Sequence, residues 1–266
     1  MPETLTVAVA QCPADLEPPE ERLDWLAGLL ASHEDAMLDL IVLPELFQCG
    51  YNIGDFSSKH AEPPDGPFAT SIAELAKRYR TAILYGFAEQ QTEGLYNSAQ
   101  CIGQNGQIIG RHRKLLLPPG FEQDNFVIGR ECKLFRLGAF TLAILVCYDV
   151  EFPENMRHVA VAGADLVVVP TALANEWSVV SECVIPTRAF ENGVFVCYSN
   201  YCGQENGLTY YGGSCIIAPD GSTLARNKNS AGLSIAHLDR SSVKAAQARM
   251  PYHADHVKLP WVRNIR

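Results

Sequence analysis

The chain has 266 residues, of which 47% are hydrophobic and 19% are charged, and its formal net charge is −9. A chain of this length can bury a sizeable core, and no composition break, repeat or linker divides it, so we expect one globular domain over residues 1–266. The negative charge repels polyanions, which argues against nucleic acid as a partner and favours a neutral or cationic small molecule.

The N-terminal residues 1–9 enter an apolar alternation directly, without the basic segment that opens a signal peptide. No apolar run in the chain approaches the roughly 20 residues that span a membrane. We therefore expect a cytoplasmic protein with no membrane partner.

Short β-type runs alternate with amphipathic helical segments along the first half of the chain. The Asn-Gly step in residues 103–106 tolerates the positive φ angles of a tight turn and predicts a hairpin there. The predicted order is strand 5–11, helix 19–33, strand 38–43, helix 68–79, strand 81–87, and then the two hairpin strands 96–102 and 107–113.

The second half continues in the same style. It predicts strand 140–146, helix 153–162, strand 166–169, helix 177–192, strand 194–199, strands 214–218, 222–226 and 232–237, and helix 241–249. Two mixed sheets need cover on both outer faces. We therefore expect an α/β fold in which two sheets pack face to face between helices, a four-layer α-β-β-α sandwich.

Three predicted strands run directly into a reactive side chain: Glu45 follows residues 41–44, Lys114 follows 108–113, and Cys147 follows 143–146. Sheets of α/β proteins place their sites at strand ends. A carboxylate, an ammonium and a thiol from three strand ends can therefore converge, which is the set that covalent acyl transfer needs.

These side chains stand in three motifs: residues 43–45 (Leu-Pro-Glu), 113–115 (Arg-Lys-Leu) and 147–154 (Cys-Tyr-Asp-Val-Glu-Phe-Pro-Glu). Their order and spacing resemble the carbon-nitrogen hydrolases of the nitrilase superfamily, and the match continues through residues 188–192 and 212–214 to 219–221. The resemblance implies the four-layer sandwich of the nitrilase type. It also implies hydrolysis of a non-peptide C–N bond by a Glu-Lys-Cys triad.

Chemistry gives each member of this triad a task. A free thiol is mostly protonated at neutral pH, so Cys147 needs a base or a nearby cation, and Glu45 beside Lys114 would provide both. The thiolate attacks the amide carbon and forms a thioester, and the oxyanion that develops would be stabilised by Lys114 and the backbone N–H of Tyr148. A water then attacks the thioester with help from a base. The resemblance implies that Glu122 positions groups or relays protons there.

Other catalytic signatures are missing: the chain has no Gly-x-Ser-x-Gly elbow, no Walker loop and no dinucleotide fingerprint. A papain-like pair, with His158 or His112 as the base for Cys147, is an alternative mechanism that no motif supports. Nine cysteines without a Cys-x-x-Cys pair favour reduced thiols. The histidine pair His253 and His256 has no nearby cysteine, so we expect no metal. We expect no cofactor either, because the thiol, the base and the oxyanion donors supply all the chemistry.

Glu151, four residues after Cys147, bears most directly on the substrate. Family members that act on carboxylate-bearing amides often carry Arg at this place, so the resemblance implies a substrate with an amino group. Residues 50–54 also resemble the branch that hydrolyses small ω-amino amides such as δ-aminovaleramide. We predict an aliphatic amino-amide amidase, with substrate-binding residues Tyr148, Glu151, Asn175 and Trp177. A nitrilase, an N-carbamoyl-amine hydrolase and a non-catalytic binding module stay open as alternatives.

The resemblance also implies a homodimer, or a higher homo-oligomer, formed through helices on one face of the sandwich. On the helix after Cys147 we expect Glu154 and Arg157 to pair, since they lie one turn apart. The C-terminal extension, residues 250–266, contains Pro251, Pro260 and Trp261 and shows little periodicity. It is expected either as an extended arm on a partner subunit or as a tail docked on its own chain.

Overall fold

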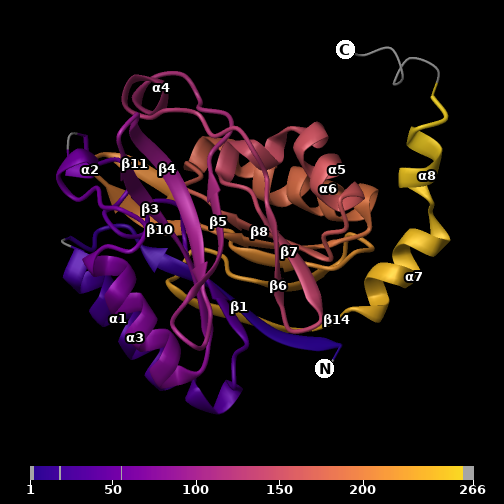
Figure 1. Ribbon diagram of the computed structural model, residues 1–266, viewed down its shortest axis with the longest axis horizontal. Coiled ribbons are helices and arrows are strands. Elements are labelled where there is room, and N and C mark those ends of the chain that lie inside the picture. The colour runs from indigo at the N-terminus through magenta and orange to yellow at the C-terminus, as the bar shows by residue number, and fades with distance from the viewer. Residues whose placement is uncertain (1–2, 18, 55, 260–266) are drawn as a thin grey trace.

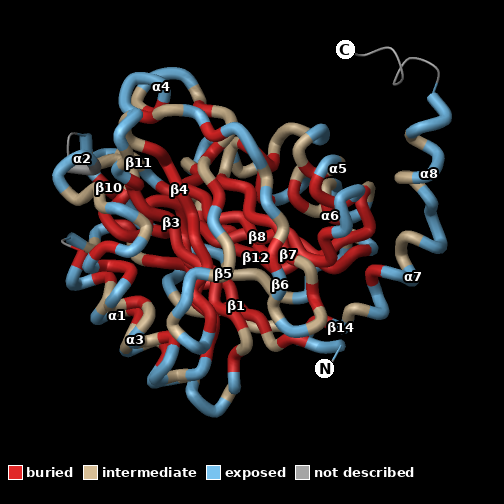
Figure 2. Tube along the Cα trace, viewed as in Figure 1, coloured by how far each residue is buried: buried red, intermediate tan, exposed pale blue. Residues whose placement is uncertain are grey.

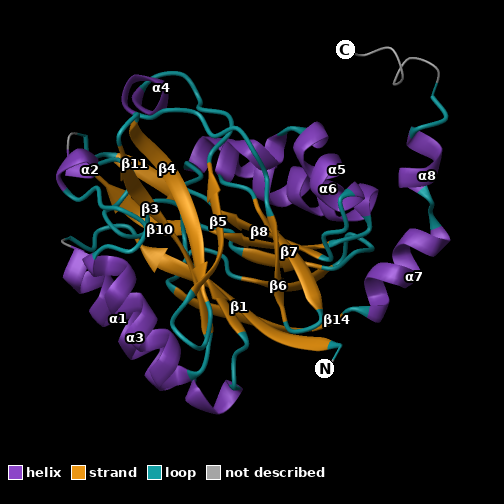
Figure 3. Cartoon of the chain, in the orientation of Figure 1, coloured by secondary structure: helices purple, strands orange, loops and turns teal. Residues whose placement is uncertain are grey.

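Two β-sheets form the centre of the computed structural model, and helices cover their outer faces (Figure 1, Figure 3). The structure describes residues 3–17, 19–54 and 56–259. The larger sheet has eight strands in the order β11-β10-β1-β2-β3-β4-β5, with β14 also paired to β1. Its strands are β1 (Thr4–Pro13), β2 (Leu40–Val42), β3 (Ala82–Gln91), β4 (Gly94–Ile102), β5 (Ile108–Arg113), β10 (Tyr201–Glu205), β11 (Leu208–Tyr211) and β14 (Gly232–Asp239).

The smaller sheet has six strands in the order β13-β12-β9-β8-β7-β6. In each sheet three neighbouring strands run parallel, β1-β2-β3 in the larger and β7-β8-β9 in the smaller. Their carboxyl ends lead into the loops where α/β proteins place functional side chains. The strands are β6 (Leu134–Leu137), β7 (Phe140–Ile144), β8 (Leu166–Pro170), β9 (Phe195–Ser199), β12 (Cys215–Ile217) and β13 (Thr223–Arg226).

Alternating residues of the strands fill the space between the two sheets. Val7 and Val9 of β1 pack in one apolar cluster with Leu142 and Ile144 of β7. The residues between them, such as Ala8, face outward into a second cluster. Because side chains of a strand alternate between its two faces, this pattern buries both sides of each sheet, as Figure 2 shows by the buried centre of the molecule.

Helices complete the outer layers, which confirms the predicted four-layer α/β sandwich. Helices α1 (Pro19–Ser32) and α3 (Pro67–Tyr79) cover the larger sheet, and α5 (Pro153–Val161) and α6 (Ile185–Asn192) cover the smaller one. Among the residues that the structure describes, none of the helices combines the length and apolar character that a membrane crossing needs. The remaining helices are α2 (Phe56–Lys59), α4 (Phe121–Asn125), α7 (Ser241–Arg249) and α8 (Tyr252–His256).

The predicted hairpin at residues 103–106 is confirmed. Strands β4 and β5 pair antiparallel, and the turn closes with a bond from the Gly106 N–H to the Gly103 carbonyl at 2.8 Å. Gly106 has a φ of +78°, which a residue without a Cβ adopts without strain.

Some elements differ from the prediction. Strands β6, β10 and β11 were not predicted. The helix predicted over residues 177–192 contains a π-helical turn, Val180–Val184, before α6 begins at Ile185. Pro186 lies just after this turn and has no N–H for a regular helical bond, which gives a local reason for the irregularity.

The C-terminal extension contains one short helix, α8, in the part that the structure describes. Its α8 lies near α6, and the ring of Tyr252 meets the ring of Phe190 at a centroid distance of 6.0 Å. At Tyr252 the segment therefore contacts its own chain. The two expectations for the extension, an arm on a partner subunit or a tail docked on its own chain, both stay predictions. Pro260 and Trp261 lie outside the described residues.

Candidate active site

Glu45 lies just beyond β2, in a loop that crosses closely over β3. A Cβ on Gly86 of β3 would lie 2.3 Å from the backbone N of Leu46 and 2.8 Å from the Cα of Glu45. Only glycine leaves room for this crossing. The loop is also held by the hydroxyl of Tyr201, which donates to the Glu45 carbonyl at 2.8 Å. These contacts fix where the Glu45 carboxylate points.

Lys114 directly follows β5, and both of its backbone polar groups are engaged. Its N–H donates to the Asn97 carbonyl at 2.8 Å, and its carbonyl accepts the N–H of Gly129 at 2.7 Å. A Cβ on Gly129 would meet the Arg113 carbonyl oxygen at 2.1 Å, so a glycine is needed at this approach too. The lysine therefore enters the site from a fixed backbone.

Cys147 opens a 3-10 turn, Cys147–Glu151, after β7. Its φ of +46° lies in the left-handed region, which a residue with a side chain rarely adopts. Strained backbone of this kind is concentrated at functional positions. The turn brings a partly buried thiol to the edge of the site.

Asp149, two residues after Cys147, joins the turn to the lysine segment. One of its carboxylate oxygens accepts the backbone N–H groups of Leu115 and Leu116, each at 3.0 Å. The other accepts the Val146 N–H at 3.1 Å and lies 2.9 Å from His112 Nε2. The carboxylate thereby ties the segment after β5, in the larger sheet, to the turn after β7, in the smaller sheet.

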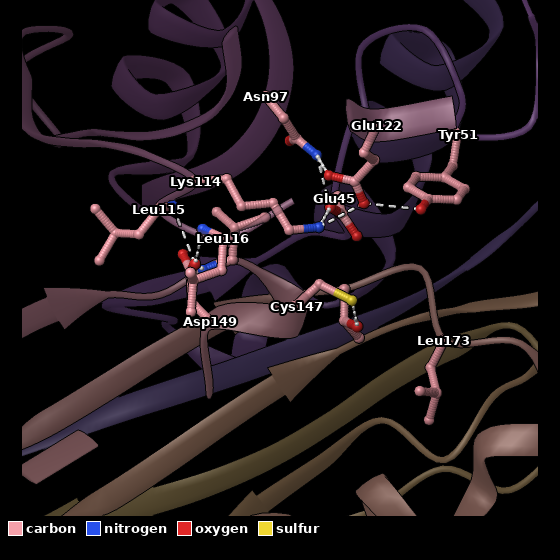
Figure 4. Close-up of polar contacts among 12 residues, drawn as sticks. Glu45, Tyr51, Asn97, Lys114, Leu115, Leu116, Glu122, Cys147, Asp149 and Leu173 are labelled. Atoms are coloured by element: carbon pink, nitrogen blue, oxygen red, sulfur yellow. Dashed lines mark hydrogen bonds and ion pairs between the residues drawn. The ribbon is translucent and has the colours of Figure 1, made fainter. Parts of the chain in front are cut away.

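Three charged side chains meet next to the thiol (Figure 4). Lys114 Nζ lies 2.7 Å from Glu45 Oε1 and 2.6 Å from Glu122 Oε1. Asn97 Nδ2 donates to both carboxylates, at 2.7 Å and 3.1 Å, and the Tyr51 hydroxyl donates to Glu122 at 2.8 Å. Glu45, Lys114 and Glu122 are all buried. The sequence-predicted residues Glu45, Lys114, Glu122 and Cys147 are thus brought together.

Burial and the neighbouring charges shift the protonation of these groups. Burial raises the pKa of Glu45 to about 7, against the lowering effect of Lys114. Burial by itself would lower the pKa of Lys114, but the two carboxylates outweigh it and raise that pKa, so the ammonium stays charged. Burial and Glu45 also raise the pKa of Cys147, which keeps the resting sulfur a thiol. A base that titrates near neutral pH therefore stands beside a neutral thiol and a fixed cation.

One oxygen of the base is free for further chemistry. Among the described residues, Glu45 Oε2 is buried without a hydrogen-bond partner, while Oε1 is bonded to Lys114 and Asn97. A carboxylate arranged in this way can accept a proton through Oε2 without breaking its other bonds. The arrangement can therefore support proton transfer from a thiol or a water.

The sequence did not reveal several residues of this cluster. Asn97 and Tyr51 bond the carboxylates, and Thr171 donates to the Cys147 sulfur at 3.0 Å. Thr171 directly follows β8, so its place at a strand end was the one available signal.

The four predicted substrate-binding residues lie on two 3-10 turns, Cys147–Glu151 and Asn175–Trp177. Glu151 is half-buried and lies within electrostatic range of Lys114. Tyr148 adjoins Cys147, and its ring packs edge-on against Phe152 at 5.0 Å. Asn175 and Trp177 lie on an exposed 3-10 turn, and no hydrogen bond among the described residues links them to the triad.

The structure corrects one pairing and weakens one alternative. Arg157 does not pair with Glu154, which is exposed. It donates to the Glu191 carbonyl at 2.7 Å, because α6 lies beside it. His158 is exposed on α5, and His112 is bonded to Asp149, so among the described residues neither imidazole is bonded to the thiol.

No group of three or more His, Cys, Asp or Glu side chains in the described ranges could hold a metal ion. A cavity of about 670 Å³ has none of Glu45, Lys114, Glu122 and Cys147 in its lining. It is lined by β5 and by residues 128–135.

Comparison with known proteins identifies the family. A model of the carbon-nitrogen hydrolase family matches residues 6–248. A protein of Pseudomonas protegens described as "Hydrolase in pqqF 5'region" is 41% identical over 260 residues, covering 95% of this chain and 89% of that protein. An (R)-stereoselective amidase of a Pseudomonas species is 30% identical over 218 residues, covering 82% of this chain and 79% of that enzyme.

A solved structure agrees. The crystal structure of an amidase from Nesterenkonia sp. superposes with a TM-score of 0.83 at 29% sequence identity, covering 93% of this chain and 95% of that one. The chain therefore belongs to the carbon-nitrogen hydrolase family, within the nitrilase superfamily.

Proposed function

We propose that the protein hydrolyses small aliphatic amides, and amino amides in particular, to a carboxylate and ammonia through a thioester on Cys147. The observation that carries this proposal is the buried cluster in which Lys114 bridges Glu45 and Glu122 beside the thiol. Variants of the Nesterenkonia amidase have been solved with acrylamide and with butyramide. In another variant, the acetamide moiety of fluoroacetamide is attached to the active-site cysteine.

The first half of the proposed reaction forms the thioester. Glu45 takes the Cys147 proton through its free oxygen, and the sulfur attacks the amide carbon. Lys114 and the Tyr148 N–H stabilise the oxyanion, typically by ~3–4 kcal/mol per donor. When the tetrahedral intermediate collapses, the C–N bond breaks and the leaving nitrogen takes the proton from Glu45, which releases ammonia.

The second half releases the acid. Glu45, again a carboxylate, takes a proton from a water, and the water oxygen attacks the thioester carbon. The C–S bond then breaks, and the Cys147 thiolate regains its proton from Glu45. Glu122 keeps Lys114 in place during both halves through its 2.6 Å ion pair. Positioning is one of the two roles, positioning or proton relay, that the resemblance implies for Glu122.

Glu151 supports the preference for an amino group. Its carboxylate is half-buried, and burial raises its pKa while Lys114 and Arg188 act to lower it. Arg188 holds the Glu151 backbone carbonyl at 2.6 Å. Among the described residues, no hydrogen bond engages the Glu151 carboxylate itself, so it is available to a substrate ammonium. A charge-assisted bond of this kind is worth about 1.5–3 kcal/mol, or roughly tenfold to a hundredfold in specificity.

The test compares kcat/KM for an ω-amino amide and for its uncharged alkyl analogue, below the amine pKa, in wild type and in Glu151→Gln. Wild type should prefer the amino amide by roughly tenfold to a hundredfold, and the variant should lose most of this preference while hydrolysing the neutral amide as before. Glu154→Gln, an exposed acid on α5, is the matched control. A wild-type preference for the neutral amide would remove the amino-amide assignment.

The same panel includes a nitrile and an N-carbamoyl amine. A protein of Pyrococcus abyssi described as a nitrilase is 30% identical over 228 residues, so the nitrile is the more important of the two controls. Carbon dioxide release would indicate a carbamoylase, and consumption of the nitrile would indicate a nitrilase. The homodimer and the cytoplasmic location stay predictions.

A further inference from the structure

The sulfur of Cys147 is contacted by a hydroxyl that the triad does not include. Thr171 Oγ1 donates to Cys147 Sγ at 3.0 Å, and the hydroxyl of Tyr198 lies 3.1 Å from the same Thr171 oxygen. Both residues are fully buried. The three side chains form one continuous chain of contacts that ends on the sulfur.

The backbone of Thr171 links the thiol to the base. Its N–H donates to the Ser199 carbonyl of β9 at 2.8 Å, and its carbonyl accepts the Glu45 N–H at 3.4 Å. Tyr198 lies on β9 as well, one residue before Ser199. Thr171 is therefore positioned by the smaller sheet and bonded to the loop of Glu45. Its hydroxyl reaches the sulfur from the smaller sheet, whereas Lys114 and Glu45 approach from the larger one.

The count of protons fixes the direction of this chain. A threonine hydroxyl has one proton, and the Thr171 proton points to sulfur. The proton between the two oxygens must then come from Tyr198, so Tyr198 donates to Thr171. Two hydroxyls that donate in sequence polarise each other, and the second bond strengthens the first. The acceptor at the end of the chain is the atom on which negative charge develops.

We propose that Thr171 is a further catalytic residue, whose hydroxyl stabilises the Cys147 thiolate during attack and again when the thiolate leaves the thioester, and that Tyr198 is the positioning residue that orients it. No proton of Thr171 is transferred: Glu45 takes the thiol proton, and the O–H···S bond becomes a bond to an anion. Bonds to charged groups are stronger than bonds to neutral ones, so the stabilisation is larger for the thiolate than for the thiol. The inference rests on the proposed role of Cys147.

The test uses Thr171→Val, which keeps the shape and removes the hydroxyl, Thr171→Ser, which restores it, and Tyr198→Phe. Two quantities are measured: kcat and KM for an amide substrate, and the rate of alkylation of Cys147 by iodoacetamide between pH 5 and 10. Thr171→Val should lose roughly tenfold to a hundredfold in kcat with little change in KM, and its alkylation midpoint should move to higher pH. Thr171→Ser should recover most of the loss, and Tyr198→Phe should fall between.

Thr81→Val is the matched control, because Thr81 is also buried and its hydroxyl donates to the Tyr79 carbonyl, away from the site. It should change the free energy of unfolding without changing kcat. Normal kcat and an unshifted alkylation midpoint in Thr171→Val would overturn the proposal, as would a Thr171→Ser variant as impaired as Thr171→Val.

Should Thr171→Val fail to fold, Tyr198→Phe decides: an unchanged alkylation midpoint in that variant overturns the proposal, and an upward shift supports it. If wild type hydrolyses no amide at all, the proposed function fails. The alkylation profiles still decide on Thr171, because they require no substrate.

Discussion

His112 Nε2 lies 2.9 Å from Asp149 Oδ2, and both side chains are buried. Since Asp149 also accepts the N–H groups of Leu115 and Leu116, this pair stands behind the segment that carries Lys114. The lysine and the cysteine come from different sheets, so their separation depends on bonds that cross between the sheets. The His112–Asp149 pair is such a bond.

Replacing His112 should therefore disturb catalysis without removing a reacting group. In His112→Leu, the Asp149 carboxylate loses one donor, and we expect kcat to fall by about tenfold or more, since small misplacements of reacting groups are costly. His112→Gln can still donate an N–H to Asp149 and should recover much of the rate. Steady-state kinetics of both variants checks this, and equal kcat in His112→Leu and wild type would contradict it.

The same pair predicts a pH dependence of stability. Burial acts to lower the pKa of His112, but its bond to Asp149 and the nearby Cys132 raise that pKa from 6.5 to about 9. A raised folded-state pKa contributes stability that is full below about pH 6.5 and is lost as the pH rises through 9. The free energy of unfolding should fall over this window in wild type, and the fall should be smaller in His112→Gln. Parallel curves for the two proteins would show that His112 does not carry the effect.

Glu45 predicts the acid side of the pH-rate profile. Its pKa is raised to about 7, mainly by burial, and only the carboxylate can accept the Cys147 proton. We expect kcat/KM to decline by about tenfold per pH unit below this value. A profile that stays flat down to pH 5 would mean that another group is the base.

The close approach of Gly86 to the loop of Glu45 predicts that a larger residue at position 86 will displace Glu45. In Gly86→Ala the new Cβ would lie 2.3 Å from the Leu46 backbone N, so the loop of Glu45 must shift, and activity should fall by about a hundredfold. Gly28 on α1 provides the control, because a Cβ there meets nothing within 4 Å. Gly28→Ala should keep full activity and gain about 0.5–1 kcal/mol of stability, as a helix-interior glycine replaced by alanine does. Activity assays and thermal unfolding of both variants make the comparison.

Much of the fold could be predicted because it depends on local signals. Helix α7 has the predicted bounds, and β4 and β5 pair about the predicted Asn-Gly turn. Strands β10 and β11 were missed because polar residues, Gln204 and Glu205 in β10 and Thr209 in β11, interrupt their apolar pattern. Their pairing depends on β1, which lies almost 200 residues away in the chain.

The site divides in the same way. Glu45, Lys114 and Cys147 each end an apolar strand within a recognisable motif, so the sequence alone could place them together. Asn97 and Thr171 stand in no such motif. Their bonds to Glu45 and to Cys147 exist only because of how β4 and β8 lie relative to the other strands. Sequence spacing does not contain that information.

The central claim is that Cys147 carries the acyl group. The enzyme is mixed with an excess of an amide that it hydrolyses, the reaction is quenched rapidly, and the peptides are analysed by mass spectrometry. The added mass of the acyl group should be found on the peptide that contains Cys147. Cys147→Ala should remain folded, show no adduct and lose turnover, because only the thiol is removed. An adduct on one of the other cysteines, or turnover by Cys147→Ala at more than a trace of the wild-type rate, would contradict the account.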